Sequence, residues 1–421
     1  MKDSKIEWVG DIPAEWECKP IRALFLENNN KNYFGKETKA LQFKFGKIVP
    51  KQNFNADDDD YVAETILKYN IVDKGMIVIN GLNLNFDFVT KRVGLVRDRG
   101  IITSAYMSFS VKDVQTVMPE YACYLLKSYD NCAAFHNMGG GVRKILNFDE
   151  LKHNLFVLPP YSEQKAIAEF LDKKCGEVDA LIADIQQEIE TLEQYKRSVI
   201  TEAVTKGLDP SVPMKESGAG WMPTIPAHWV VHPLYYYFEE RKNKNSFAKE
   251  QNLLSLSYGK IIRKDINANG GLLPESFNAY NIVEPKDIVL RLTDLQNDKR
   301  SLRTGFVNER GIITSAYITL RAKKDIMQEY FYYELHVFDL LKGLYNMGSG
   351  VRQGLNFDEL SKLKLFEPTM KEQIEIVAYI KEKEKKIEEI IAEKQSQIET
   401  LESYKKSLIY EYVTGKKEVI A

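Results

Sequence analysis

The chain contains an internal duplication, and this feature limits its possible folds more than any other. Residues 92–106, RVGLVRDRGIITSAY, match residues 303–317 at eleven of fifteen positions. Residues 137–151, NMGGGVRKILNFDEL, match residues 346–360 at twelve of fifteen. A repeat of this length in constant order indicates that one folding unit has been copied. The sequence therefore predicts two similar modules, each about half of the 421-residue chain.

The first part of each copy, residues 1–160 and 208–369, mixes short β-like runs with turn residues and brief helical patches. Gly75–Asn80 and Ile101–Val111 are examples of the apolar runs, and Tyr121–Ser128 is a helical patch between them. Apolar runs of four to eight residues bounded by turn residues are typical of strands. We expect an α+β globular domain in each copy.

The second part of each copy, residues 161–207 and 370–421, is predicted to be one long helix. Apolar residues recur every seven positions, which indicates a coiled-coil seam. In the first helix these are Leu171, Val178, Ile185, Leu192 and Val199, and in the second they are Ile380, Ile387, Leu401 and Leu408. The apolar face of the first helix is widened by Ile167, Leu181, Ile182, Ile189 and Tyr195. At 1.5 Å per residue, each helix is roughly 60 Å long. A free helix would expose this stripe, so we expect the two helices to pair with each other, in a direction that the pattern leaves open.

Composition is that of a globular protein, with 44% hydrophobic residues and a net charge of −2. No run of about 18 apolar residues and no apolar signal segment is present, so we expect a cytoplasmic protein without a membrane partner. Four cysteines without close spacing are expected to be buried or idle thiols. The slightly negative charge requires any nucleic-acid contact to be made by a local basic face or with the help of a partner.

The whole pattern resembles the specificity subunit of type I restriction–modification enzymes. The resemblance rests on the openings Trp8–Trp16 (WVGDIPAEW) and Trp221–Trp229 (WMPTIPAHW), and on the Gly-rich turn followed by LNFDEL in both copies. The helix entry at residues 158–164 (LPPYSEQ) and the helix ends EQYKRSVI and LESYKKSLI also fit the family. The second helix entry at residues 366–373 departs from it, with one proline in place of two.

This resemblance implies that each globular part is a target-recognition domain that reads one half of a two-part site in double-stranded DNA. It also implies that the helices set the gap between the half-sites and bind two methyltransferase subunits, and that motor-nuclease subunits join for restriction. S-adenosylmethionine, ATP and Mg would then belong to the partner subunits, and the chain would need no cofactor of its own. Half-sites one turn apart lie about 34–36 Å from each other. That function favours antiparallel helices related by an internal pseudo-two-fold axis.

Two motifs that resemble catalytic sites are better explained as structure. Leu158–Tyr161 (LPPY) is similar to the Asn/Asp-Pro-Pro-Tyr loop of adenine methyltransferases, but Leu158 offers no hydrogen-bonding group, so a helix-entry turn is favoured. The Glu150-x-Lys152 pattern of metal-dependent nucleases has Ser361 in place of the lysine in the other copy. An acidic first helical turn is the simpler interpretation.

Metal and nucleotide sites are also disfavoured. His228 and His232 have zinc-ligand spacing, yet their counterparts in the first copy are Glu15 and Lys19. The glycines at 139–141 lack the βαβ context of a dinucleotide-binding loop. The acidic run at residues 57–60 is more readily a solvated loop than a cation site. The sequence predicts no catalytic and no metal-binding residues.

If the two copies read different bases, shared positions should serve the scaffold or phosphates, and diverged positions should read bases. The sharpest divergence is NGLNLNFDFVTK at 80–91 against RLTDLQNDKRSL at 291–302. Asn and Gln pair with adenine, and Arg and Lys with guanine. The candidate DNA-binding residues are Asn80, Asn83, Asn85, Lys91 and Lys144 in the first copy, Arg291, Gln296, Asn297, Lys299, Arg300 and Gln353 in the second, and the shared Arg143 and Arg352, for which a phosphate contact and a structural turn are equally good explanations.

Two other classes of function remain open. A non-catalytic scaffold would use the helices to assemble partners and the modules to bind protein. A stand-alone nuclease or methyltransferase would need an active site that the sequence does not offer. Ser104, Tyr106, Ser315 and Tyr317 belong to the shared motifs, and we expect them to be buried strand residues.

Overall fold

The computed structural model describes residues 1–52, 65–88, 91–140, 144–247, 249–267, 274, 276–295, 302–347 and 354–419. Contacts divide the chain into two compact units. Unit 1 is Met1–Gln186 with Gln395–Ala421, and unit 2 is Gln187–Lys394. Each unit therefore combines one globular part with half of each long helix.

Unit 1 is built from short strands and helices in an order that unit 2 repeats. Its strands are β1 (Lys2–Asp3), β2 (Asp11–Ile12), β3 (Glu17–Pro20), β4 (Phe25–Glu27), β5 (Leu41–Lys44), β6 (Lys47–Pro50), β7 (Asn70–Val72), β8 (Ile77–Ile79), β9 (Val93–Leu95), β10 (Gly100–Ile102), β11 (Met107–Val111) and β12 (Leu155–Leu158). Its helices are α1 (Ile21–Leu24), α3 (Pro119–Asn131), the 3-10 helix η1 (Ala134–Asn137), α4 (Phe148–Leu151) and the start of α5 (Tyr161–Lys206).

Unit 2 has the corresponding elements. Its strands are β13 (Met214–Ala219), β14 (Met222–Pro226), β15 (Val230–Pro233), β16 (Phe238–Glu240), β17 (Leu254–Ser257), β18 (Lys260–Arg263), β19 (Asn281–Val283), β20 (Ile288–Leu290), β21 (Thr304–Phe306), β22 (Gly311–Ile313), β23 (Ile318–Ala322) and β24 (Lys364–Glu367). Its helices are α6 (Leu234–Tyr237), α7 (Gln328–Leu340), the 3-10 helix η2 (Gly343–Asn346), α8 (Phe357–Leu360) and the start of α9 (Met370–Val413).

A four-stranded antiparallel sheet forms the centre of each unit, with the order β4-β11-β8-β9 in unit 1 and β16-β23-β20-β21 in unit 2. A 13-residue helix, α3 or α7, packs on the sheet, and its buried residues join the sheet and the long helices in one core. Trp16 and Trp229, which mark the two openings, are both buried in these cores. The predicted α+β class is confirmed.

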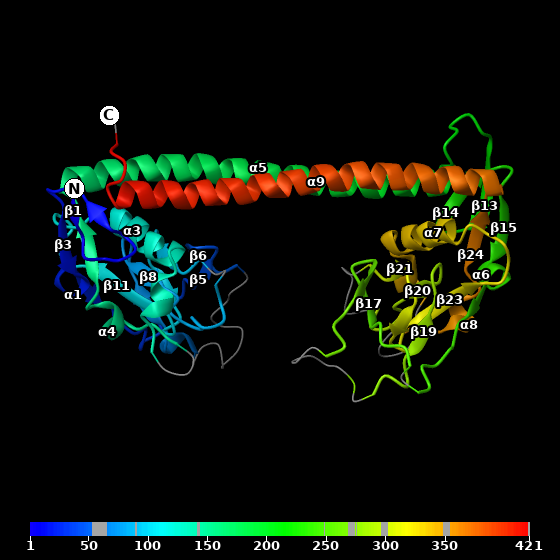
Figure 1. Ribbon diagram of the computed structural model, residues 1–421, viewed down its shortest axis with the longest axis horizontal. Helices are drawn as coiled ribbons and strands as arrows, with labels where there is room; N and C mark the ends of the chain where they lie inside the picture. The colour runs from blue at the N-terminus through cyan, green and yellow to red at the C-terminus, as the bar shows by residue number, and fades with distance from the viewer. Residues whose placement is uncertain are drawn as a thin grey trace. The chain divides into compact units, whose positions relative to one another are not determined.

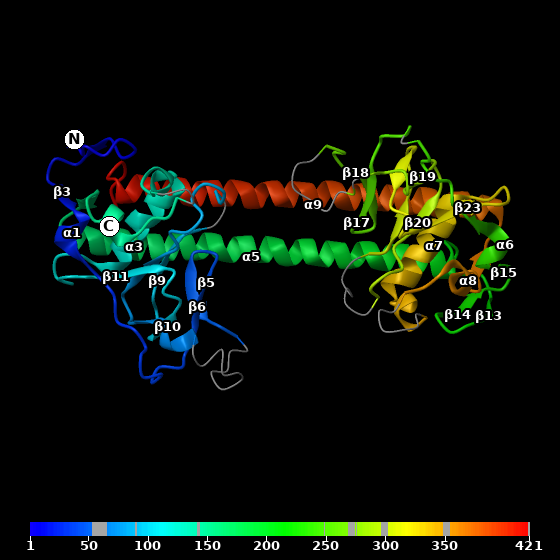
Figure 2. The same cartoon turned by 90° about the horizontal axis from the view of Figure 1, so that it is seen from below.

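The long helices α5 and α9 lie side by side within each unit (Figures 1 and 2). In unit 1, Phe170 stacks on Tyr412 at 4.5 Å between ring centroids, and Lys405 pairs with Asp179. In unit 2, Lys196 pairs with Glu388 at 3.7 Å. Residue numbers rise along one helix as they fall along the other, so the helices are antiparallel, as predicted.

The seam between the helices is narrower than the predicted apolar face. Leu181 and Tyr195 in α5 are more than half exposed, as is Tyr404 in α9. Ile390, the counterpart of Leu181, is 43% exposed. Two helices can bury only the residues that face each other, and these four lie outside that stripe. Of the residues expected to widen the apolar face, Ile167 is buried and Ile182 and Ile189 are half-buried, whereas Leu181 and Tyr195 lie outside the seam.

Two sequence expectations concern chemistry rather than shape. All four cysteines are free thiols: Cys123 and Cys175 are buried, Cys18 is half-buried and Cys132 is exposed. Among the residues that the structure describes, no helix combines the length and the apolar character that a membrane span requires.

Candidate nucleic-acid interface

The described parts of the most diverged segment of the duplication, residues 80–88 with 91–92 and residues 291–295 with 302–303, lie between two strands of each central sheet. We call residues 80–92 the β8–β9 loop and residues 291–303 the β20–β21 loop. Strand register places the start of each loop beside the start of the neighbouring strand, because Ile79 pairs with Met107 and Leu290 pairs with Ile318. The loops therefore occupy the same position in the two units.

A fully buried arginine, Arg92, holds the β8–β9 loop from beneath. Its guanidinium donates to the carbonyl oxygens of Asn80 at 3.0 Å, Leu82 at 2.7 Å and Asp87 at 2.5 Å. The Arg92 backbone N–H donates to the carboxylate of Asp130 in α3 at 2.7 Å. Burial raises the pKa of Asp130, and the hydrogen bond from Arg92 and the guanidinium charge oppose this shift.

Arg303 makes the same connections in unit 2. It is also fully buried, and its guanidinium donates to the carbonyl oxygens of Arg291 at 3.1 Å, Thr293 at 2.8 Å and Asp294 at 3.2 Å. Its backbone N–H donates to Asp339 in α7 at 2.6 Å.

In both units the guanidinium donates to three backbone oxygens of the loop, and Arg92 also pairs with the Asp87 carboxylate at 3.6 Å. Backbone contacts of this kind hold the path of the loop while most of its side chains can change. The anchor is shared and the loop sequence is not.

The Gly-rich turn packs against the β8–β9 loop. Leu84 N–H donates to the carbonyl of Lys144 at 3.2 Å, and Leu146 N–H donates to that of Gly81 at 2.9 Å. A Cβ on Gly139 would lie 2.8 Å from the Leu84 side chain. These contacts favour a structural role for the described part of the turn, and they bring the turn and the loop into one surface.

The predicted base-reading residues of unit 1 divide by their surroundings. Asn83 is exposed, with a left-handed backbone at φ +54°, and Asn85 is half-buried. The Asn80 side chain accepts from Leu82 N–H at 3.2 Å within the loop. Lys91 pairs with Glu402 of α9 at 2.9 Å, and Lys144 donates to the carbonyl of His136 at 3.3 Å. Asn83 is the most exposed of the three asparagines, whereas the side-chain oxygen of Asn85 is buried, and all five assignments remain predictions.

In unit 2, Arg291 is half-buried at the start of the β20–β21 loop. The other candidates of unit 2 lie outside the described residues: Gln296, Asn297, Lys299, Arg300 and Gln353. The shared arginines of the Gly-rich turns, Arg143 and Arg352, and the acidic run at 57–60 also lie outside them. Their assignments stay predictions.

Two aromatic residues of the β8–β9 loop were missed by reasoning from hydrogen-bonding side chains alone. Phe86 and Phe88 are 78% and 70% exposed. The Phe88 ring stacks on His136 of η1 at 4.7 Å, with 10° between the planes. Exposed aromatic rings on a binding surface commonly mark contact sites. Their presence in a polar loop was the sequence signal that could have identified them.

The expectation that Ser104, Tyr106, Ser315 and Tyr317 are buried strand residues is wrong. Both serines are exposed, both tyrosines are half-buried, and the segments form turns before β11 and β23. Tyr106 N–H donates to the carbonyl of Thr103 at 3.2 Å, which closes the turn. The continuous apolar run therefore contains two strands and the reversal between them.

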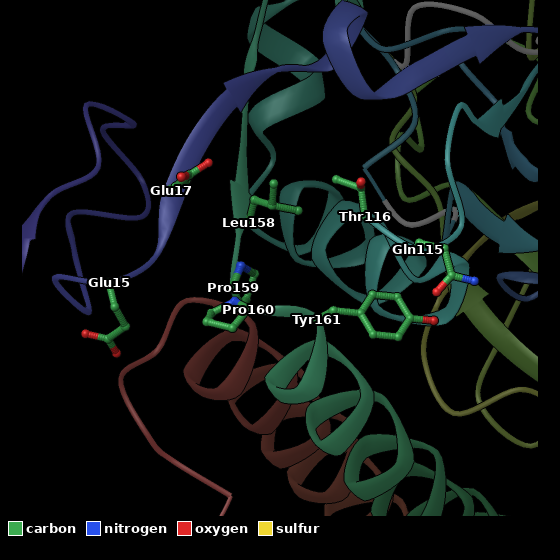
Figure 3. Close-up of a pocket in the computed structure, with 8 residues that line it drawn as sticks. All are labelled: Glu15, Glu17, Gln115, Thr116, Leu158, Pro159, Pro160 and Tyr161. Carbon is green, nitrogen blue, oxygen red and sulfur yellow. The ribbon is translucent and has the colours of Figure 1, made fainter.

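The LPPY segment lies at the start of α5 beside a hollow of about 290 Å³ (Figure 3). Leu158 is buried in the core of unit 1 and brings no hydrogen-bonding group. Glu17 pairs with Lys19 at 2.8 Å, and in Figure 3 its side chain points away from Tyr161. Helix α5 begins at Tyr161, in agreement with a helix-entry turn.

The other motifs have structural roles as well. Glu150 and Asn147 form a capping box at α4, and Glu359 and Asn356 form the equivalent box at α8. His228 contacts Glu372 at 2.8 Å, whereas His232 stacks on Tyr236. Within the described ranges, no three His, Cys, Asp or Glu side chains gather as a metal site would require.

The chain is similar to known proteins of one family. Residues 16–191 match the family model described as the type I restriction modification DNA specificity domain. The MjaX type I restriction enzyme specificity subunit of Methanocaldococcus jannaschii is 23% identical over 391 residues, covering 89% of this chain and 88% of that protein. The MjaVIII specificity subunit of the same organism is 28% identical over 250 residues, covering 55% and 54%.

One solved structure, from work on complex assembly and conformational transition of the type I R-M system, has the same fold. Its TM-score is 0.67 at 13% identity, over 97% of this chain and all of that chain.

Proposed function

We propose that the chain is a specificity subunit of a type I restriction–modification system and that it reads a two-part site in double-stranded DNA; its similarity to the specificity domain and to curated specificity subunits supports this. Unit 1 reads one half-site and unit 2 the other, each through the loop on its buried arginine. The subunit acts in the cytoplasm and directs methyltransferase and motor-nuclease subunits to the site.

A single observation carries this proposal: the two units share the anchor of the loop and differ in the loop itself. Arg92 and Arg303 hold their loops through backbone oxygens, and Arg92 also pairs with the carboxylate of Asp87, so most loop side chains can vary. A protein-binding scaffold that used two equal modules for one partner would have no reason to diversify this loop. Two different base sequences, read by one framework, require that pattern.

Exposed apolar residues at equivalent positions of the long helices support the binding of two copies of one partner protein, one on each unit. Leu181 and Tyr404 are exposed on the helix pair of unit 1, and their counterparts Ile390 and Tyr195 are exposed on that of unit 2. Equivalent apolar positions that a soluble protein leaves open are typical of protein-binding surfaces. We assign them to two methyltransferase subunits, one on each unit.

We further propose that the chain itself catalyses no reaction. S-adenosylmethionine would be bound by the methyltransferase subunits, and ATP and Mg by the motor-nuclease subunits. The residues of the LPPY segment and of the Glu150-x-Lys152 pattern serve helix entry and capping here.

The test is methylation mapping. The chain is co-produced with its methyltransferase subunits, and the methylated positions in the host genome are sequenced. We expect a split motif with an unspecified gap, and replacing residues 80–91 with those of another specificity subunit should change one half only. A motif that is unaffected by the replacement, in a complex that still assembles, would support the scaffold and refute the proposal.

The helices are proposed to set the gap between the half-sites. Adding one heptad to α5 after Leu192, and one to α9 at the level opposite, lengthens each helix by about 10 Å. At about 3.4 Å per base pair this corresponds to a gap about 3 base pairs longer. Methylation mapping gives the gap directly, and an unchanged gap would mean that the helices do not set it.

A further inference from the structure

A second pair of equivalent loops lies at the same sheet edge as the β8–β9 and β20–β21 loops. Residues 30–37 read NKNYFGKE, and residues 243–250 read NKNSFAKE, identical at six of eight positions. They follow β4 and β16. β4 and β8 are both antiparallel to β11, and β16 and β20 are both antiparallel to β23, so the chain leaves β4 and β16 towards the same end of the sheet as it leaves β8 and β20.

Each of these loops is closed by one buried asparagine. Asn32 donates to the carbonyl of Glu37 at 2.8 Å and accepts from Glu37 N–H at 3.2 Å. Asn245 makes the same two bonds with Glu250, at 3.0 and 3.1 Å. Both asparagines are 2% exposed. Asn32 also donates to the carbonyl of Ile66 at 3.4 Å, which ties its loop to a neighbouring segment. A buried amide that bridges the two ends of a loop in this way restricts the shape of the loop.

The closed loop presents a phenylalanine to solvent. Phe34 is 85% exposed and Phe247 is 83% exposed. A lysine ammonium lies over each ring, Lys36 at 5.8 Å and Lys249 at 5.7 Å from the centroid. The residues just beyond the loop differ between the copies, so the exposed ring and its lysine have been kept where their neighbours have not.

The acidic residue of each loop is turned inward to an arginine. Glu37 pairs with Arg99 at 3.2 Å, and Glu250 pairs with Arg310 at 3.0 Å. The arginine thus balances the negative charge of the glutamate. The exposed part of the loop carries an aromatic ring beside a lysine ammonium. That combination suits double-stranded DNA, whose sugars and groove-facing base edges offer apolar contact to a ring and whose phosphates accept an ammonium.

Building on the proposed function, we propose that residues 30–37 and 243–250 are sequence-independent DNA clamps. Phe34 and Phe247 pack on the sugar and base surface of the duplex, and Lys36 and Lys249 bind phosphates. β4 and β8 in unit 1, like β16 and β20 in unit 2, are two strand spacings apart, about 10 Å, which is close to the major-groove width of about 12 Å. One loop can therefore contact base edges in the groove while the other contacts the sugar–phosphate backbone beside it. Because the second loop is nearly the same in both units, it cannot distinguish one base sequence from another.

The test uses the complete complex with methyltransferase subunits. Binding constants for a duplex with the methylated motif and for an unrelated duplex are measured by fluorescence anisotropy at several salt concentrations. Phe34→Ala and Phe247→Ala should each weaken both duplexes by the same factor, about fivefold or more. Lys36→Gln and Lys249→Gln should each lower the slope of log K against log salt by about 0.9. The methylated motif should stay the same.

Val114→Ala is the matched control, because Val114 is exposed beyond the opposite end of β11 and should leave both affinities unchanged. Circular dichroism melting checks that each variant is folded. Weakening of the motif duplex alone would make the phenylalanines base readers and overturn the clamp. Lost methyltransferase binding with unchanged DNA affinity in the remaining complex would assign the loops to a protein partner and also overturn it. Failure of the wild-type complex to bind either duplex would instead refute the proposed function.

Discussion

Unit 1 and unit 2 keep the same loop anchor but differ in the space behind the sheet. In unit 1 a cleft of about 850 Å³ lies between the β5–β6 hairpin, α3 and the long helices. In unit 2, Tyr332 of α7 donates to the carbonyl of Gly259 in the equivalent hairpin at 3.5 Å, and His336 lies against the same glycine. Their counterparts in α3 are the smaller Cys123 and the half-exposed Lys127.

The same two helices differ in buried charge. Glu334 of α7 is fully buried and accepts from Phe366 N–H at 2.7 Å, whereas the equivalent position of α3 is the apolar Leu125. The copies have therefore exchanged residues behind the sheet while preserving the arginine anchors. This difference indicates that the path of the loop has been constrained more tightly than the packing that supports it.

The largest expected effect comes from removing one anchor. Arg92→Ala leaves three carbonyl oxygens of the β8–β9 loop without their buried donor, at a cost of about 3–5 kcal/mol. Hydrogen exchange should rise at residues 80–92 and stay unchanged at 291–295, and recognition of one half-site should be lost. Arg303→Ala is the reciprocal variant and should affect only the other loop. Equal loss of protection in both units from either variant would contradict separate anchors.

A smaller effect concerns the dependence of unit 2 on pH. Burial raises the pKa of Glu334 well above its usual range, so the stability that depends on its neutral form is present at low pH and is lost as pH rises. Burial, with Arg197 and Lys196 nearby, lowers the pKa of His336 to about 4. Stability linked to His336 is therefore present above about pH 6.5 and is lost as pH falls towards 4, by at most about 3 kcal/mol.

Unit 2 should thus tolerate a narrower pH range than unit 1. Amide exchange of α7 and α3, corrected for intrinsic rates at pH 5, 7 and 9, measures the two units in one experiment, with α3 as the internal control. Glu334→Gln keeps an acceptor for Phe366 N–H and should remove the loss on the alkaline side. His336→Gln should remove the loss on the acidic side. If α3 and α7 respond alike to pH, buried charge does not distinguish the units.

The smallest loss of stability is expected from the salt bridges that occupy equivalent positions in the two units. Asp179 bridges Lys47 at 3.2 Å and Lys405 in unit 1, and Glu388 bridges Lys260 at 3.0 Å and Lys196 at 3.7 Å in unit 2. These carboxylates are partly exposed, so Asp179→Asn and Glu388→Gln should each cost only about 0.2–1 kcal/mol. Urea unfolding of both single variants and the double variant should give equal and additive losses. A clear inequality would show that these matched bridges contribute differently to the two units.

The duplication, the α+β class and the long helices could be predicted because their signals are continuous along the chain. The antiparallel direction followed from a functional argument, and the contacts of Asp179 with Lys405 and of Lys196 with Glu388 confirm it within each unit. Heptad spacing alone could not supply it, since it is the same for both directions.

The parts that sequence reasoning missed depend on three-dimensional neighbours. Arg92 was noticed only as the first residue of a repeat, because nothing in the sequence shows that its guanidinium is buried under a loop. The turn at Ser104 was hidden in an apolar run, where two short strands resemble one longer strand. Phe34 and Phe247 could have been found by aligning residues 30–37 with residues 243–250, which follow β4 and β16. This match covers only eight positions, fewer than the fifteen of the other shared motifs.

The most direct test of two independent readers gives both units the same loop. Residues 291–302 are replaced by a copy of residues 80–91, and the methylated motif is mapped in cells that also produce the methyltransferase subunits. The account predicts a motif whose second half becomes an inverted copy of the first, with the gap unchanged. An assembled, active complex that still methylates the original motif would contradict it.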